Sequence, residues 1–374
     1  MGAPLQIDAD FRGGNVILDR IEGDRVWVHQ DPRDTEGWWF YWHMRVRGAA
    51  GRTLTFTFTD GDCLGAMGPA ASVDQGRSWH WLGAGAAEVA SSFRLAFPND
   101  AQDARLCLAV PYLQADWASF VRTLRGNAHT DRGVLCRSRK GRDVEWLRVG
   151  RLDGQAEHCL VLTCRHHCCE MMASYALEGF VHAMLADDVV GRWWRERAEV
   201  LIVPFVDPDG VEEGDQGKNR RPHDHYCDYA GTSVYPETAA IREFLPAWAR
   251  GRLKVALDLH CPWIRGGRNE QIYLVGNRGD VTWAELTRFS GVLESHQAGK
   301  LRFATANNLP WGQDWNTYEG PLVCFAAWAE TLPGVRFAST LELPYALAGG
   351  RAVTPANARD FGRDLATALK AYLE

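Results

Sequence analysis

The chain has 374 residues, of which 46% are hydrophobic, and carries a formal net charge of −6. This length exceeds what one ordinary core needs and suits two domains. The mild negative charge argues against a general nucleic-acid-binding protein, which would carry a basic face. The sequence shows no apolar signal region at its start and no apolar run of about 18 residues. We therefore expect no membrane span, and ten cysteines without a regular spacing favour a reducing compartment such as the cytoplasm.

Residues 1 to about 115 contain short runs rich in aromatic and β-branched side chains. Several of these runs alternate polar and apolar positions, which is the pattern of half-buried strands. Turn residues separate the runs, and few helical patterns intervene. The runs read "RVWVHQD", "GWWFYWHMRVRG", "RTLTFTFTD", "SFRLAFPND" and "ARLCLAVPY". We predict an N-terminal antiparallel β-sandwich domain over residues 1–118.

The pattern changes where "QADWASFVRTLRGN" predicts a helix that Asp116 can cap. The stretch "VLCRSRKGRDVEWLRVG" then predicts a hairpin that turns at Lys140 and Gly141. After it, predicted strands and helices alternate from "HCLVLT" to a closing helix in "TPANARDFGRDLATALKAYL". Such alternation implies a mostly parallel sheet covered by helices on both faces. Residues 119–374 are therefore predicted to form an α/β/α domain.

Side chains that can bind a metal follow the predicted strands of this second domain. In open α/β sheets, functional residues gather beyond the carboxyl ends of the strands. His166, His167 and Glu170 follow "HCLVLT", His260 ends "KVALDLH", and Glu342 follows "RFASTL". Two histidines and one glutamate, with a water in the fourth position, form a catalytic zinc arrangement. The sequence therefore predicts a catalytic Zn²⁺ site.

Spacing alone leaves two points about this site open. His166 and His167 both lie within helical reach of Glu170, so the spacing does not choose between them as ligands. The cysteines at 164, 168 and 169 could instead form a structural zinc site with His166. A structural site normally joins two separated pairs of ligands, and the sequence offers no second pair near this one. We therefore favour the catalytic arrangement.

The order of four motifs resembles the zinc metallocarboxypeptidases of the M14 type, and within them the cytosolic carboxypeptidase branch. "HCCE" is similar to the family's His-x-x-Glu motif and selects His167 and Glu170. "DPDG" at 207–210 is similar to the family's Asn-Pro-Asp-Gly turn, "DLH" supplies His260, and "TLE" supplies Glu342. The resemblance implies zinc held by two histidines and one glutamate, in a carboxypeptidase domain that follows a sandwich domain.

The resemblance also implies a role for each residue of the site. Zinc would lower the pKa of a bound water to about 7, and Glu342 would act first as general base and then as general acid. The family places an arginine beside the oxyanion of the intermediate, and here we favour Arg220 over Arg221. Asp224 fits the family's aspartate that binds the first zinc histidine, His167. The implied substrate is the C-terminus of a peptide or protein.

One position departs from the family pattern. The family's Asn-Arg pair holds the terminal carboxylate of the substrate, and Tyr226 and Cys227 stand in its place here. Neither side chain can form the two parallel hydrogen bonds of a guanidinium with a carboxylate. We expect Tyr226 and Arg221 at the substrate site, with Arg265 and Arg268 as the nearest substitutes for the missing arginine.

Three functions are compatible with these features. The first is a zinc-dependent metallocarboxypeptidase that hydrolyses C-terminal residues from peptides or protein tails. The second keeps the metal and acts as an amidohydrolase or deacylase on small N-acylated amino acids, because the Asn-Arg pair is missing. The third is a catalytically degenerate binding protein, for the same reason. We favour the first, because the three ligands and Glu342 occur in the family's order.

Overall fold

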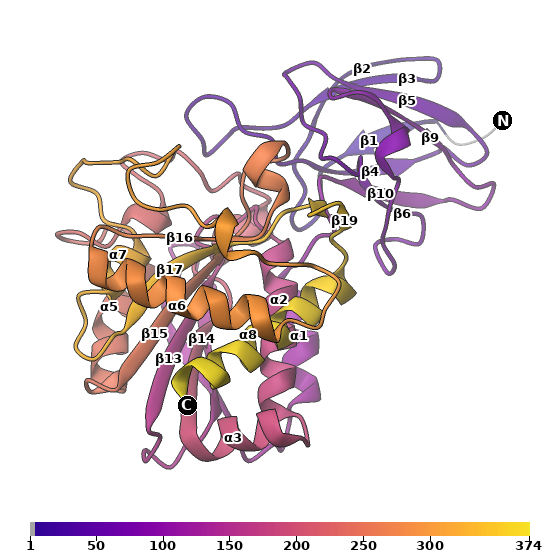
Figure 1. The fold of residues 1–374 in the computed structure, drawn as a ribbon. Helices are drawn as coiled ribbons and strands as arrows, with labels where there is room; N and C mark the ends of the chain where they lie inside the picture. The colour runs from indigo at the N-terminus through magenta and orange to yellow at the C-terminus, as the bar shows by residue number, and fades with distance from the viewer. Residues whose placement is uncertain (1–3) are drawn as a thin grey trace.

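The computed structural model describes residues 4–374 and contains two N-terminal five-stranded sheets followed by one seven-stranded sheet. In Figure 1 the N-terminal strands, coloured indigo to purple, lie to the upper right of the larger sheet and its helices. The predicted fold, an antiparallel sandwich followed by a mostly parallel α/β/α region, is confirmed. The division into domains near residue 118 stays a prediction.

The N-terminal region consists of short strands in two sheets. The first sheet has the order β1 (Gln6–Asp8), β4 (His43–Arg47), β10 (Asp103–Cys107), β6 (Ala70–Ser72) and β7 (His80–Trp81). The second has the order β2 (Ile17–Glu22), β3 (Arg25–His29), β5 (Thr53–Phe58), β9 (Ser92–Ala96) and β8 (Ala87–Val89). Neighbouring strands are antiparallel, apart from β3 and β5, which run parallel.

Alternating burial explains these strands, and one aromatic run departs from it. Along β5 the leucine and two phenylalanines are buried while the threonines between them are half-buried, because successive side chains of a strand point to opposite faces. Of the predicted run over residues 37–48, only His43–Arg47 joins a strand. The main chain of Tyr41 instead exchanges hydrogen bonds of 2.8 and 2.9 Å with the side chain of Gln216. A distant loop thus replaces a strand partner.

A helix and a hairpin connect the two regions. The helix α1 (Gln114–Thr123) begins as predicted, but Asp116 stabilises its start from within the first turn, where it accepts the Leu113 amide at 2.8 Å. The hairpin of β11 (Thr130–Arg137) and β12 (Asp143–Gly150) is also present as predicted. The hairpin extends the seven-stranded sheet at one edge.

The seven-stranded sheet is the frame of the second region. Its order is β11, β12, β14 (Ala198–Val203), β13 (His158–Cys164), β15 (Leu253–His260), β17 (Phe337–Glu342) and β16 (Tyr273–Val275). The central strands β14, β13, β15 and β17 are parallel to one another, and the outer pairs are antiparallel. Residues along β13 alternate between two cores, with Leu160 and Leu162 in the larger and Val161 in the smaller. Burial on both faces accounts for the continuous apolar strands.

Helices cover both faces of this sheet (Figure 1). The larger core includes residues of α2 (Met172–Leu185), α3 (Val189–Arg197), α6 (Asp280–His296) and α8 (Pro355–Leu373). The smaller core includes residues of α5 (Pro236–Ala249) and α7 (Phe325–Ala329). The pattern did not predict α3, which buries only Gly191 and Trp194 and so lacks a long apolar stripe. Within the described chain, no helix has the length and apolar character needed to cross a membrane.

The parallel strands end together at one edge of the sheet. Cys164 at the end of β13 pairs with Leu259 of β15, and His260 of β15 pairs with Glu342 of β17. This register brings the turn after β13 next to His260 and Glu342. The edge formed by the carboxyl ends of β13, β15 and β17 therefore carries the predicted chemistry.

Candidate active site

Three predicted metal ligands converge where β13 and β15 end. The Nδ1 atoms of His167 and His260 lie 3.0 Å apart. The carboxylate of Glu170 lies 3.0 Å from Nδ1 of His167 and 2.7 Å from Nδ1 of His260. All three side chains are buried. The three groups can therefore share one small ion.

These donors fit zinc in kind and in spacing. Zinc binds histidine nitrogen and carboxylate oxygen at about 2.0–2.2 Å, so neighbouring ligand atoms of a tetrahedral site lie roughly 3.3 Å apart. The measured separations between donors, 2.7 to 3.0 Å, require only a small widening. His167 and His260 also line an open cleft, which gives a water or substrate access to the fourth coordination position of the ion. The cluster therefore suits a catalytic site with three protein ligands.

Neighbouring residues orient each ligand. Asp258 accepts a hydrogen bond from Nε2 of His260 at 2.6 Å, which directs Nδ1 of that ring toward the metal position. The amide of Cys261 donates to Glu170 Oε2 at 3.1 Å. Asp224 lies 3.7 Å from Nε2 of His167 and so stands on the side of the ring opposite the ligand atom. The structure thus brings Asp224 to the histidine that the sequence assigned to it.

The structure distinguishes the two neighbouring histidines that spacing could not. His166 is fully buried, with Nδ1 2.8 Å from Asp258 Oδ1 and Nε2 2.7 Å from the Tyr229 hydroxyl. It belongs to a second cluster with Asp258 and His260, but both of its nitrogens already have partners. His166 therefore forms a hydrogen bond with Asp258 inside the core, whereas His167 lines the cleft.

Glu342 ends β17 directly beside His260 and lines the same cleft. Its side chain is buried, and its Oε2 atom has no hydrogen-bond partner among the described residues. Burial and the charge of Glu170 raise the pKa of Glu342 to about 7, although His260 and Lys218 act in the opposite direction. A carboxyl group with such a pKa can take up and return a proton near neutral pH.

The structure places three of the predicted arginines away from this cleft. They form ion pairs near the surface: Arg221 with Glu36, Arg265 with Asp62 and Arg268 with Asp314. Across residues 4–374, none of these guanidinium groups is among those that line the metal cleft. The geometry therefore argues against the predicted substrate-binding role of these three arginines.

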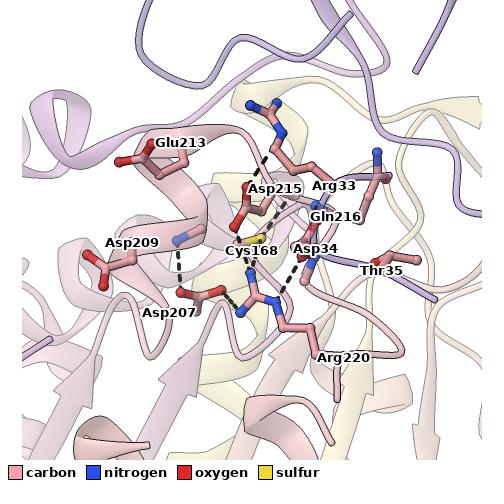
Figure 2. A network of polar contacts seen from close by, with 12 residues as sticks. Arg33, Asp34, Thr35, Cys168, Asp207, Asp209, Glu213, Asp215, Gln216 and Arg220 are labelled. Carbon is pink, nitrogen blue, oxygen red and sulfur yellow. Dashed lines mark hydrogen bonds and ion pairs between the residues drawn. The ribbon is translucent and has the colours of Figure 1, made fainter. Parts of the chain in front are cut away.

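Arg220 is buried among carboxylates, as Figure 2 shows. Its Nε donates to Asp34 at 2.8 Å, its Nη1 to Asp207 at 2.7 Å and its Nη2 to Asp215 at 3.1 Å. Only 11% of the side chain is exposed. Because all three nitrogens are engaged with carboxylates, Arg220 is not placed to stabilise an oxyanion in the cleft. This arrangement argues against its predicted catalytic role and indicates a structural one.

Lys218, which no sequence motif singled out, lies two residues before Arg220 and lines the metal cleft. Its Nζ lies 2.9 Å from Glu170 Oε1. In the part of the chain that the structure describes, it is the one lysine or arginine that lines the metal cleft. Burial would lower the pKa of Lys218, but the charges of Glu170 and Glu342 raise it above its usual value. The site therefore holds a fixed positive charge beside a metal ligand.

The cleft has a volume of about 470 Å³ and largely aromatic walls. The aromatic residues that line it are Trp39, Tyr226, Trp263, Tyr273 and Trp315. The ring of Tyr226 lies 5.3 Å from that of His167 and 4.9 Å from that of His260, and its hydroxyl lies 3.0 Å from Thr340 Oγ1. Tyr226 thus reaches the predicted position but brings no positive charge. The sequence did not identify the tryptophans, because they come from three distant segments.

The cysteines beside the ligands behave as packing residues. Cys168, Cys169 and Cys261 are buried. Burial raises the pKa of Cys169 to about 12 and the pKa of the other two well above the usual range, so these thiols are protonated. No cysteine in the described chain belongs to a metal-binding cluster. The alternative of a structural zinc site is therefore not supported.

A larger crevice, of about 710 Å³, lies between the N-terminal region, α1 and α8. The residues that line it include none of the three metal ligands. Two of its arginines already have carboxylate partners, Arg12 with Glu212 at 3.2 Å and Arg359 with Glu178 at 2.6 Å. The smaller cleft is therefore the candidate active site.

Comparisons with known sequences agree with the metal cluster. Residues 129–232 match the family model described as zinc carboxypeptidase. An uncharacterised protein of Zymomonas mobilis is 25% identical over 222 residues, which is 56% of this chain and 55% of that protein. Cytosolic carboxypeptidase 2 of Danio rerio is 24% identical over 209 residues, which is 51% of this chain and 28% of that protein. The chain thus spans about half, or less, of the length of these curated relatives.

Solved structures share the fold over the whole chain. A metallo-carboxypeptidase from Burkholderia cenocepacia superimposes with a TM-score of 0.81 at 17% identity, covering 99% of each chain. A metallo-carboxypeptidase from Pseudomonas aeruginosa, in complex with (2-guanidinoethylmercapto)succinic acid, gives a TM-score of 0.78 at 21% identity, covering 98% of this chain and 99% of that one. At these identities the likeness shows the fold.

This fold carries a His-x-x-Glu…His cluster at the carboxyl ends of its parallel strands, and that cluster suits a zinc ion. Residues 129–232 are similar to the zinc carboxypeptidase family, and the chain shows distant similarity to cytosolic carboxypeptidase 2 and a shared fold with bacterial metallo-carboxypeptidases. Zinc is the cofactor of that family, and His167, Glu170 and His260 are the residues that would hold it.

Proposed function

We propose that the protein is a zinc-dependent metallocarboxypeptidase that hydrolyses the bond before the C-terminal residue of a peptide or protein tail. The observation that carries this proposal is the position of Glu342. It lies beside the metal cluster on the neighbouring strand, with an unpartnered carboxylate oxygen, in a cleft large enough for a side chain. Ten free cysteines are compatible with the cytoplasm as its location.

Glu342 is the acid–base residue of this reaction. Zinc, when bound, supplies a Lewis acid and lowers the pKa of its water to about 7. Glu342 takes a proton from the attacking water and later passes it to the leaving nitrogen. Burial, and the charge of Glu170, raise the pKa of Glu342 above its usual value, which favours uptake of a proton. Asp258 keeps the His260 ring in the orientation that presents Nδ1 to the metal, and Asp224, 3.7 Å from Nε2 of His167, stands where it can do the same for that ring.

Lys218 takes the role that the sequence analysis gave to Arg220. The carbonyl oxygen of the substrate becomes negative as water adds, and it needs a fixed positive group close to the metal. Lys218 is the cation that lines the cleft, and its Nζ lies 2.9 Å from a ligand oxygen of Glu170. Arg220 is engaged with three carboxylates and does not line the cleft.

The test is the substitution Glu342→Gln, which keeps the size of the side chain but removes its proton-transfer ability. We expect the variant to retain one zinc per chain and to lose about 10²–10⁴-fold in the rate of release of C-terminal residues from a peptide library. Metal content and amino-acid release should be measured on the same samples. A variant that cleaves as fast as the wild type would refute the proposal.

A second candidate function is favoured by the absence of a guanidinium among the described residues that line the cleft. Without the two parallel hydrogen bonds of an arginine, a free α-carboxylate gains little from this site. A small N-acylated amino acid carries the same carboxylate, but an amidohydrolase or deacylase can take more of its binding energy from the acyl group and so depends less on that grip. The aromatic walls suit an apolar acyl group.

Matched substrates separate the two functions. One peptide is prepared with a free C-terminal carboxylate and again with a C-terminal amide, and an N-acylated amino acid is tested beside them. Strong preference for the free acid supports the carboxypeptidase, whereas turnover of the N-acylated amino acid without peptide cleavage supports the deacylase. Tight zinc binding with no hydrolysis of any substrate would instead favour the degenerate binding protein.

A further inference from the structure

The loop segment over residues 214–220, which carries Lys218, is fastened to the N-terminal region. The side chain of Gln216 binds the main chain of Tyr41, and it also donates to the carbonyl of Asp31 at 3.2 Å. The side chain of Asn15 donates to the Gly214 carbonyl at 2.8 Å. These contacts join residues that are about half the chain apart in sequence. The segment therefore takes its shape from the N-terminal region.

Asp34 is the centre of this attachment, as Figure 2 shows. Its Oδ1 accepts the amide of Gln216 at 2.9 Å, and its Oδ2 accepts the amide of Gly217 at 2.8 Å. The same Oδ2 accepts Nε of Arg220 at 2.8 Å. One carboxylate thus holds the main chain just before Lys218 and the side chain just after it. The Asp34 side chain is 12% exposed, so water competes little for these bonds.

The residues after Asp34 hold the main chain of Lys218 itself. The hydroxyl of Thr35 donates to the carbonyl oxygen of Lys218. The amide of Glu36 donates to the carbonyl oxygen of Asn219 at 3.1 Å. The short run from Asp34 to Glu36 therefore contacts the main chain on both sides of the Lys218 side chain. The main chain from which the Lys218 side chain extends is therefore held on both sides, and its Nζ is held at its far end by Glu170.

The local backbone of the loop makes this support necessary. Gly217 has φ of +74° and Asn219 has φ of +50°, in the left-handed region that asparagine tolerates but most side chains avoid. A Cβ atom on Gly217 would lie 2.6 Å from the amide nitrogen of Cys168. The turn around Lys218 is thus sharp and tightly packed, and contacts outside the loop stabilise it.

The charges around Arg220 keep the attachment rigid. Arg220 lies between Asp34, Asp207 and Asp215, so that one positive charge faces three carboxyl groups. Burial, followed by the charge of Asp34, raises the pKa of Asp215 to about 7. The charge of Arg220, aided by hydrogen bonds, lowers the pKa of Asp207 to about 2 even though burial opposes this shift. A buried cluster in which Arg220 bonds to three carboxyl groups therefore anchors the loop.

We infer that Asp34 is a positioning residue that, through the loop segment 214–220, holds Lys218 against the metal site, so that the N-terminal region completes the active site. This inference rests on the catalytic role proposed for Lys218. It gives the N-terminal region a part in the reaction itself, in addition to any contact that this region makes with a substrate.

A double-mutant cycle on the full-length, zinc-loaded chain tests the inference. The variants are Asp34→Asn, Lys218→Met and the combination of both. In Asp34→Asn, the new NH₂ group would face N–H groups that donate hydrogen bonds to the carboxylate in the wild type. We therefore expect kcat/KM to fall about 10- to 100-fold with zinc content unchanged. In the Lys218→Met background, the same substitution should cost less than about threefold, because the residue it positions is already gone.

A matched control separates positioning from general stability. Asp8→Asn removes a carboxylate that pairs with Arg45 at 2.6 Å and Arg47 at 3.0 Å in the N-terminal region, away from the loop. We expect this variant to keep wild-type kcat/KM even where its melting temperature falls as far as that of Asp34→Asn. An equal loss of kcat/KM from Asp34→Asn in both Lys218 backgrounds, or no loss in either, would overturn the inference.

A second readout does not depend on hydrolysis and so separates failure of the inference from failure of the proposed function. Brief acylation with an amine-reactive reagent, read by peptide mass spectrometry, reports the accessibility of Lys218. We expect Lys218 to be protected in the wild type and modified at least about fivefold faster in Asp34→Asn, with the exposed Lys300 as internal reference. Equal protection in both proteins would contradict the positioning role, even if no substrate is cleaved.

Discussion

The two sides of the candidate active site are built in different ways. On the metal side, His260 and Glu342 end two paired strands, and His167 lies in the turn that follows a third. On the other side, Lys218 stands on a loop whose main chain is held by residues near Asp34. The metal side depends on the register of one sheet, whereas the cationic side depends on contacts between two regions. Substitutions can therefore damage one side while leaving the other intact.

Removal of a metal ligand should break the metal side completely. We expect His167→Ala to lose its zinc and all measurable hydrolysis, because two donors remain where zinc needs at least three protein ligands. Metal content after dialysis and peptide release provide the measurement. Cys169→Ala, which changes a buried neighbour with no contact to the ion, serves as control and should keep both. Stoichiometric zinc in His167→Ala would show that another residue is the ligand.

Removal of the cation should damage catalysis and spare the metal. Lys218→Met is expected to lower kcat by about 10²–10³-fold, because a preorganised positive group beside the oxyanion is lost. Zinc content should stay at one per chain, and the exposed Lys300→Met should behave as the wild type in both assays. Steady-state kinetics provide the measurement. An unchanged kcat for Lys218→Met would show that Lys218 takes no part in the reaction.

Loss of the buried arginine should appear as instability. Arg220→Met leaves three carboxyl groups without their partner, and we expect the free energy of unfolding to fall by about 3–5 kcal/mol. The neighbouring Arg221, whose side chain is 82% exposed, offers a matched control. Arg221→Met should stay within about 0.5 kcal/mol of the wild type in chemical denaturation. A stable Arg220→Met variant would contradict the anchoring role.

The buried cluster should also make stability depend on pH. The pKa of Asp215 is about 7 in the folded protein, against an ordinary value of 3.8. Between these values the folded protein binds a proton that the unfolded chain lacks, so stability falls as the pH rises from about 4 to 7. Melting temperatures of Asp215→Asn, which cannot ionise, should lack this fall of a few degrees. If the melting temperatures of Asp215→Asn and the wild type changed with pH in the same way, Asp215 would not be the group responsible.

The smallest effects should come from the arginines that were expected to bind substrate. Arg265→Ala and Arg268→Ala remove side chains that pair with Asp62 and Asp314 outside the cleft. We expect KM to change by less than about twofold for either substitution. A substitution raises KM when it removes a contact with the substrate, and neither side chain lines the cleft. A tenfold rise in KM would place a guanidinium in the substrate site after all.

Local pattern predicted much of the second region correctly. Long apolar strands and amphipathic helices are read from neighbouring residues, which is why β13, β15, β17 and α8 appear where expected. The pattern failed where a distant partner decides the local structure. The aromatic run over residues 37–42 leaves the sheet because Gln216 takes the hydrogen bonds of Tyr41. The helix α3 was missed because only two of its residues are buried.

The same distinction runs through the site itself. His167, Glu170, His260 and Glu342 could be chosen from motifs because strand ends bring metal-binding residues to one edge of a sheet. Lys218 could not be chosen, since nothing in "GDQGKNRR" tells which of six polar side chains turns toward the metal cleft. Two left-handed residues and the contacts of Asp34 make that choice.

The sequence by itself thus determined the succession of elements, the metal-binding motif and the glutamate beside it, because each depends on periodicity and spacing within a short stretch. The tertiary structure alone decided which cation lines the cleft and which arginine is buried among carboxylates. The physical reason is that the direction and burial of a polar side chain depend on partners outside its own short stretch, such as Glu170 for Lys218 and Asp34 for Arg220. Charge and hydrogen bonding between those partners carry no signature along the chain.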